Sequence, residues 1–208
     1  SPSIGVYNIV LAAAATLLAT AAPALAKLPT PVSAATARSY LASLKVELEN
    51  NNPRYDRDLF PHWAEISGAC NTRKMVLKRD GTDVVTNRQC AITSGTWYSP
   101  YDGDTVDDPS DVDIDHVVAL KEAWVSGARL WTDAQRAAFA NDLIRPQLVA
   151  VTDEINKAKG SKDPSTWLPP RTSFHCTYLR AWVQVKHHYG LSVDSAEKRA
   201  IAKRLENC

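Results

Sequence analysis

Apolar positions recur every three or four residues in two parts of this chain, and this period predicts helices. The first helix should end near Asn50, with an apolar face made of Ala37, either Tyr40 or Leu41, Leu44 and Leu48. A second helix should end at Gly190, a residue suited to the left-handed position after a helix, with an apolar face of Tyr178, Trp182, Val185 and Tyr189. A capping box from Asp194 to Glu197 predicts a third helix that carries Ile201 and Leu205.

The middle of the chain alternates short β-branched runs with helical patterns. Residues 113–120 and 147–151 read as two strands. Between them lie two helical patterns, the second opening with a capping box at Thr132. After the second strand, Thr152 or Asp153 caps a helix that ends before Gly160. The order of strand, helical insertion, strand and helix indicates an α+β protein.

The four cysteines contain no C-x-x-C pair, which argues against a zinc knuckle or a redox motif. Residues 75–79 and 82–86 flank Asp80 and Gly81, a sequence typical of a type I′ hairpin that would bring Cys70 to Cys90. If the last two helices are antiparallel, Cys176 reaches Cys208. We expect two disulfides with structural roles.

The N-terminus reads as a secretory signal peptide. Residues 10–22 are uncharged, and Ala24, Leu25 and Ala26 form an A-x-A cleavage signal. This run is shorter than the roughly 20 apolar residues needed to span a bilayer. We therefore expect a secreted, extracellular protein whose mature form has no membrane segment. The net charge of +1 means that any polyanion must be bound by a local patch.

Asp115 and His116 stand side by side in the first strand, and Asn156 lies on the helix that follows the second. Carboxylate and amide oxygens suit Mg²⁺-type ions, and imidazole accepts a proton near neutral pH. This combination predicts a phosphodiesterase with one metal ion.

The chain resembles the HNH (His-Me finger, ββα-metal) nucleases, and most closely the secreted HNH proteins of the GmrSD-type C-terminal family. The resemblance covers most of the mature chain. It rests on residues 57–63, 72–73, 97–101, 113–116, 123–124, 126–128, 139–143, 156, 159–160, 167–170, 176–178, 182–186 and 208.

This resemblance implies that His116 is the general base, that Asp115 and Asn156 hold a divalent metal, with Mg²⁺ as the first candidate, and that Gln147 takes the place of an asparagine that orients the base. Hydrolysis would leave a 5′-phosphate and a 3′-hydroxyl. Two residues depart from the family pattern. Ala119 replaces a proline, which should alter rigidity more than chemistry, and Lys74 follows Arg73 where relatives often carry an acid.

For several polar residues the sequence is compatible with two roles. Arg73 either binds phosphate or packs structurally. Lys157, Lys159 and Lys162, with Arg171, form either a substrate-binding basic patch or a solvated face. Asp113 either orients a neighbour or is a solvated turn acid. The acid-rich loop near residues 102–111 is either a calcium site or solvated, and it lacks the EF-hand spacing.

The sequence thus predicts an α+β protein with a ββα-metal HNH core, helical insertions, a β-hairpin and two disulfides. Residues 1–26 would form the signal peptide, 27–52 a linker and N-terminal helix, and 53–208 the HNH-like nuclease domain. The predicted function is a metal-dependent endonuclease acting on nucleic acid, DNA or also RNA. The alternative, favoured by Lys74, is a secreted binding protein or effector that keeps the scaffold without turnover.

Overall fold

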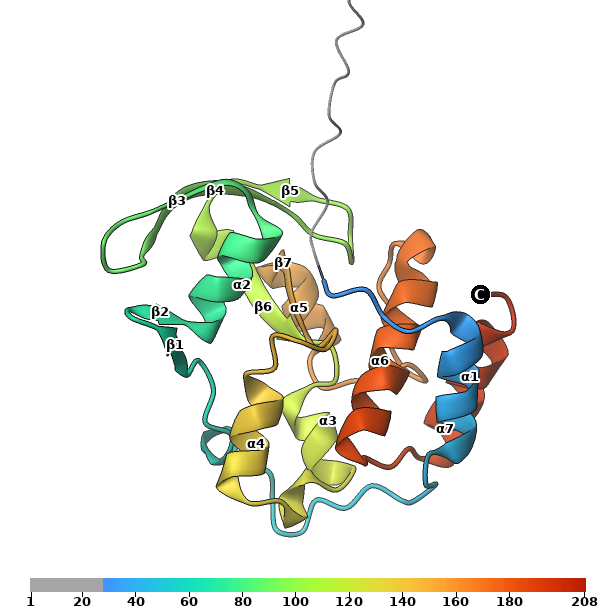
Figure 1. Ribbon diagram of the computed structural model, residues 1–208. Coiled ribbons are helices and arrows are strands. Elements are labelled where there is room, and N and C mark those ends of the chain that lie inside the picture. The colour runs from blue at the N-terminus through green and yellow to red at the C-terminus, as the bar shows by residue number, and fades with distance from the viewer. Residues whose placement is uncertain (1–27) are drawn as a thin grey trace, which may run out of the picture.

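The computed structural model describes residues 28–208 (Figure 1), so the expected signal peptide lies outside the described residues. Its helices are α1 (Ala34–Ser43), α2 (Thr72–Asp80), α3 (Leu120–Val125), α4 (Asp133–Ala140), α5 (Asp153–Lys159), α6 (His175–Tyr189) and α7 (Ser195–Leu205). Its strands are β1 (Glu65–Ser67), β2 (Cys70–Asn71), β3 (Thr82–Thr86), β4 (Ile92–Tyr98), β5 (Thr105–Val106), β6 (Val112–His116) and β7 (Leu148–Thr152). Short 3₁₀ turns are η1 (Arg57–Leu59), η2 (Pro109–Asp111), η3 (Ala128–Leu130) and η4 (Thr172–Phe174). Within this part of the chain, every helix is too short or too polar to cross a bilayer.

The centre of the fold is the antiparallel pair β6 and β7, followed directly by α5. The register pairs Val112 with Thr152 at one end and His116 with Leu148 at the other. All of β7 is buried, as its apolar sequence predicts. α5 packs against both strands (Figure 1), so the strand, insertion, strand and helix expected from the sequence form one compact ββα unit. The protein belongs to the α+β class.

The helical half of the molecule packs α1 against α6 and α7 (Figure 1). α1 ends at Ser43, earlier than the apolar period suggested. The chain then becomes extended, and Val46 forms a parallel bridge with Val193. Leu48, which the period placed on the apolar face, is 90% exposed. Ala37, Leu41 and Leu44 join the same hydrophobic core as α6, so this N-terminal helix is part of the main body.

One buried charge network crosses this half. The Lys186 ammonium donates to Glu122 Oε1 over 2.7 Å and also to Glu197, and all three side chains are almost fully buried. Trp182 Nε1 donates to Glu197 at 2.6 Å. Two carboxylates thus share one ammonium, and burial raises the pKa of the Glu197 carboxyl to about 7.

The hairpin predicted around Asp80 and Gly81 is wrong. Residues 75–79 belong to helix α2, which begins where the Asn71 side chain accepts the Lys74 backbone N–H. A type I′ turn needs positive φ at both central residues, whereas Gly81 has φ −84° and ends the helix. Three consecutive apolar residues fit a strand or a helix, and the buried set of Thr72, Val76, Leu77 and Asp80 follows the helical period. The hairpin in this region is instead formed by β3 and β4.

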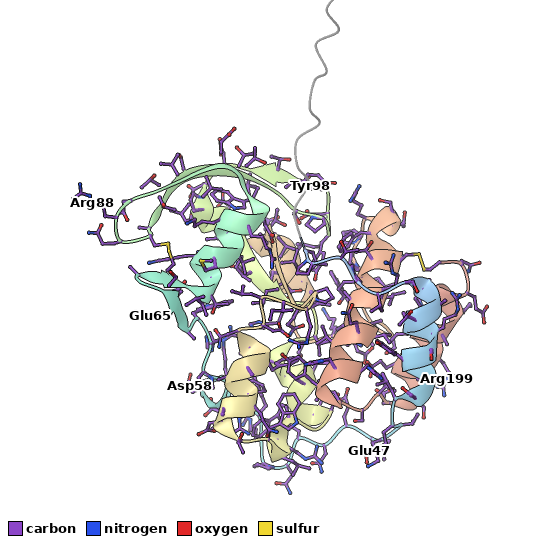
Figure 2. The ribbon with its side chains drawn as sticks, viewed as in Figure 1. Glu47, Asp58, Glu65, Arg88, Tyr98 and Arg199 are labelled. Atoms are coloured by element: carbon purple, nitrogen blue, oxygen red, sulfur yellow. A yellow bond between two sulfur atoms is a disulfide. The ribbon has the colours of Figure 1, made fainter. Side chains whose placement is uncertain are left out.

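Both expected disulfides are present, Cys70–Cys90 and Cys176–Cys208 (Figure 2). The second pairing follows as expected, because α6 and α7 bring the start of one helix to the end of the other. The capping boxes at Thr132 and Asp194 and the left-handed Gly190 after α6 are confirmed. Cys70 reaches Cys90 although the segment between them is a helix and a strand.

Candidate active site

A cleft of about 330 Å³ opens where β6, α3 and α5 meet the segment around η1. Its walls bring together the three residues on which the sequence prediction depended, His116, Asp115 and Asn156. Its full lining is Tyr55, Arg57, Ile114, Asp115, His116, Ala119, Leu120, Lys121, Asn156, Gly160 and Ser161. Residues far apart in the sequence therefore share one concave surface.

His116 is held as a neutral imidazole of one tautomer. Its Nε2 lies 2.9 Å from the backbone carbonyl oxygen of Ala140, and because a carbonyl can only accept, Nε2 carries the proton. Burial disfavours the charged ring and lowers the pKa of His116 to about 3. Nδ1 then carries a lone pair at neutral pH, but the burial that disfavours the imidazolium also weakens the ring as a base.

Asp115 occupies a satisfied, buried position. Its Oδ1 accepts from the Lys159 ammonium at 2.9 Å, and its Oδ2 accepts from the Tyr101 hydroxyl at 2.6 Å. Burial raises the pKa of the Asp115 carboxyl, whereas the charge of Lys159 favours the ionised form. Burial beside this carboxylate also raises the pKa of Tyr101 well above its usual value, so Tyr101 remains a hydroxyl donor.

Asn156 reaches the cleft from α5, and its orientation is fixed by Asp113. Nδ2 of Asn156 donates to Oδ2 of Asp113 at 2.9 Å. This bond leaves the side-chain carbonyl oxygen of Asn156 available as a ligand. Of the two readings for Asp113, the structure supports the one in which it orients a neighbour.

The cleft offers the ligand types that a Mg²⁺-like ion prefers, a carboxylate and an amide oxygen. Each Asp115 oxygen has two lone pairs, so the bonds from Lys159 and Tyr101 leave acceptor capacity on both. The donor set therefore fits a hard divalent cation. The Lys159 ammonium already balances the charge of Asp115, so a cation there would gain less from that carboxylate than from a free one.

Gln147 and Arg73 lie outside the cleft lining. The Gln147 amide bonds both the N–H and the carbonyl of Val118, at 3.0 and 2.9 Å, and so braces the segment just after His116. The Arg73 guanidinium donates to the Val112 carbonyl at 2.9 Å, at the start of β6. His116 lies four positions after Val112 on this strand, or about 13 Å away. The contacts of Arg73 therefore fit the structural role, and not the binding of phosphate, among the two roles that the sequence allowed.

The expected basic patch does not form as one surface. Lys159 is fully buried and bonds Asp115 and the His116 carbonyl, so it has no exposed atoms for a substrate phosphate, and this part of the prediction is wrong. Lys157 and Lys162 are exposed, and their ammonium groups contact Asp153 and the Ala158 carbonyl. Neither lines the cleft.

The positive charges that do line the cleft are Arg57 and Lys121, which the sequence reasoning did not assign to substrate binding. Arg57 comes from η1, and Lys121 from the first turn of α3. Tyr101, the donor to Asp115, lies in the connection between β4 and β5. Arg57 and Tyr101 fall within segments on which the family resemblance rests, but no spacing or motif gives either residue a role, since their proximity to His116 arises from the tertiary fold.

Lys74, the residue that favoured a non-catalytic protein, lies elsewhere. Its ammonium donates to the carbonyls of Ala69 and Gln89, both at 3.2 Å, beside the Cys70–Cys90 bridge. The side chain thus joins the two ends of the disulfide loop. The other departure, Ala119, does line the cleft and has φ −58°, a value that proline also adopts.

The acid-rich loop lines a separate cleft of about 370 Å³, together with Asp153 and Glu154 from the first turn of α5. Asp102 accepts from the Thr152 hydroxyl and from the Asp104 backbone, and Asp108 accepts from Ser110. The bonds from Asp104 and Ser110 are local turns within the loop, whereas the bond from Thr152 ties Asp102 to the end of β7.

Comparison with known proteins places this site in context. The family model described as "GmrSD restriction endonucleases, C-terminal domain" matches residues 72–204, which contain β6, α5 and the three candidate residues. A protein of Arthroderma benhamiae named "Uncharacterized secreted protein" is 55% identical over 198 residues, covering 94% of this chain and 95% of that protein. No solved structure gives a significant match. The chain belongs to the GmrSD restriction endonuclease C-terminal domain family.

Proposed function

We propose that this protein is a secreted, divalent-metal-dependent endonuclease that hydrolyses phosphodiester bonds in nucleic acid. The observation that carries the proposal is the single cleft shared by His116, Asp115 and Asn156, with the His116 tautomer fixed by Ala140. Membership of a restriction endonuclease domain family supports a nuclease-related activity.

His116 acts as the general base. Its Nδ1 takes a proton from a water molecule in the cleft, and the resulting hydroxide attacks the phosphorus. The bond from phosphorus to the 3′-oxygen breaks, and this oxygen takes a proton from water and leaves as the 3′-hydroxyl. The imidazolium that forms keeps its Nε2–H bond to the Ala140 carbonyl, so the ring does not have to turn during the step. Gln147 fixes the backbone just beyond the base through Val118.

Asp115 and Asn156 are the residues that would hold the metal, which when bound stabilises the negative charge that develops on the phosphate. Lys159 and Tyr101 keep the Asp115 carboxylate in place, and Asp113 keeps the Asn156 amide in place. These contacts fix both candidate ligands before any ion arrives, which reduces the entropy lost on binding.

Arg57 and Lys121 supply the local positive charge that the net charge of the chain does not provide. Their side chains bind the phosphate backbone on the walls of the cleft. The exposed Lys157, on α5, and Lys162, just after α5, supply further positive charge outside the cleft. Because these contacts are to phosphate and not to bases, cleavage depends weakly on the nucleotide sequence. The substrate is DNA, RNA or both.

Secretion is supported by three independent features. The A-x-A signal at residues 24–26 precedes the described part, two disulfides suit an oxidising compartment, and the similar fungal protein is named as secreted.

The test is a cleavage assay on supercoiled plasmid, linear duplex and single-stranded RNA with Mg²⁺, Mn²⁺, Ca²⁺ or EDTA. We expect nicking that EDTA abolishes and that the variant His116→Ala lacks, while its melting curve stays close to that of the wild type. His188→Ala, an exposed-histidine control, should cleave normally. Absence of cleavage by the folded wild type with every ion would instead support a binding protein on a nuclease scaffold.

A further inference from the structure

The end of helix α4 contacts the candidate base directly and also holds a segment that contacts it. Ala140 is the last residue of α4, and its carbonyl, which has no partner within the helix, accepts the Nε2–H of His116 at 2.9 Å. The carbonyl end of a helix carries partial negative charge, which favours the imidazolium formed during catalysis. The next residue, Asn141, is the C-cap.

The side chain of Asn141 uses all of its hydrogen-bonding capacity. Nδ2 donates to the carbonyls of Pro61 at 2.7 Å and Ala137 at 2.8 Å. Oδ1 accepts from the Ala64 backbone at 2.9 Å and the Thr72 hydroxyl at 2.8 Å. A primary amide has two donors and two acceptor sites, so none is left over. Asn141 therefore clamps the segment from Pro61 to Ala64 onto the end of α4.

That clamped segment carries Trp63 in an unusual conformation. Trp63 has φ +58°, in the left-handed region, which is strained for a bulky residue. Its indole lies nearly parallel to the His116 ring, with centroids 5.6 Å apart and an angle of 20° between the planes. The bonds of Asn141 on both sides of Trp63 hold the backbone in this strained form.

We infer that Asn141 and Trp63 are positioning residues for His116. The Ala140 carbonyl fixes the edge of the imidazole, and Trp63 covers one face, so rotation of the ring would break a hydrogen bond and separate the stacked rings. Through Asn141 and Ala140, one helix end sets both contacts. This inference rests on the proposed function only where activity is measured, because the orientation of the ring can be measured without catalysis.

The test uses the variants Asn141→Ala, Trp63→Ala and Trp63→Phe in the full chain. The first readout is the ¹⁵N spectrum of the His116 imidazole, which distinguishes the Nε2–H from the Nδ1–H tautomer. We expect Asn141→Ala and Trp63→Ala to populate both tautomers, and Trp63→Phe, which keeps an aromatic face, to retain mainly Nε2–H. The second readout is cleavage, where the two alanine variants should lose roughly 10- to 100-fold in kcat with KM nearly unchanged.

Asn87→Ala is the matched control, since the Asn87 side chain also caps a turn, through the N–H groups of Gln89 and Ala91, on the β3–β4 hairpin. It should leave the His116 tautomer and kcat unchanged. A single Nε2–H tautomer in folded Asn141→Ala and Trp63→Ala would overturn the inference, and so would equal kcat losses in the Asn87 control. If Asn141→Ala does not fold, the comparison of Trp63→Ala with Trp63→Phe decides the question. If the wild type cleaves nothing, the spectrum still tests the positioning role.

Discussion

Lys159 donates from its ammonium to the carboxylate of Asp115 across 2.9 Å, and the two side chains are 0% and 6% exposed. The same ammonium donates to the His116 carbonyl at 2.8 Å. One buried cation thus ties the end of α5 to the end of β6, beside the base. The sequence predicts that Asp115 is a metal ligand and that Lys159 contacts substrate, whereas in the fold the two side chains form an ion pair.

Replacing Lys159 by Met should lower the free energy of unfolding by about 3–5 kcal/mol, because Asp115 would remain as an unpaired buried charge. The double variant Asp115→Asn, Lys159→Met should recover much of this loss. Urea unfolding monitored by circular dichroism measures both. Lys157→Met is the control, since Lys157 is exposed and pairs with Asp153 on the surface. Equal effects of the two lysine variants would contradict the importance of the buried pair.

Removing positive charge from the cleft should weaken nucleic-acid binding more than it slows the cleavage step. In a His116→Ala background with EDTA, Arg57→Ala and Lys121→Ala should each raise Kd for a duplex and reduce the slope of log K against log salt by about one. Fluorescence anisotropy at several salt concentrations measures this slope.

The control for these cleft charges is Arg88→Ala, at the outer end of the β3–β4 hairpin (Figure 2). This substitution removes the same charge but not from the cleft. An Arg88 variant that loses as much affinity as the Arg57 variant would place the binding surface elsewhere.

The Lys186 network should make stability fall as pH rises toward neutrality. Glu197 has a pKa of about 7 in the folded protein, against 4.5 for an unperturbed glutamate side chain. The folded state therefore binds more protons between these values, and the contribution of Glu197 to stability decreases from about pH 4.5 to pH 7. Urea unfolding of the wild type and of Glu197→Gln across this range should give a difference in stability that shifts steadily against the wild type. A difference independent of pH would show that Glu197 does not titrate there.

Each disulfide should contribute stability without taking part in cleavage. The bridges close loops of 20 and 32 residues, for which chain entropy predicts about 3–4 kcal/mol each. Replacing Cys176 and Cys208 by Ala should lower Tm, while the cleavage rate of the folded variant stays near that of the wild type. Loss of cleavage in a fully folded variant would mean that the bridge also shapes the active site.

Local signals were sufficient for much of the fold. The capping boxes at Thr132 and Asp194, the glycine after α6 and the β-branched run before Thr152 all specify structure through nearest neighbours, so these elements appear where the sequence predicts them. Residues 75–79 are the instructive failure. Their short apolar run suits either a strand or a helix, and the burial of one helical face, together with the Asn71 cap, decides between them.

The sequence by itself determined the ββα order and the Cys176–Cys208 pair, and it singled out His116, Asp115 and Asn156, because each depends on a spacing or a motif that can be read along the chain. The Cys70–Cys90 bridge forms as expected, but through a helix and a strand and not through the hairpin from which it was predicted. Only the tertiary structure decided that Lys159 is internal, that Arg57 and Lys121 line the cleft, and that Trp63 covers the base. These properties depend on which distant segments meet and which charges become buried. Desolvation and long-range hydrogen bonds, as at Asn141, leave no periodic trace in the sequence.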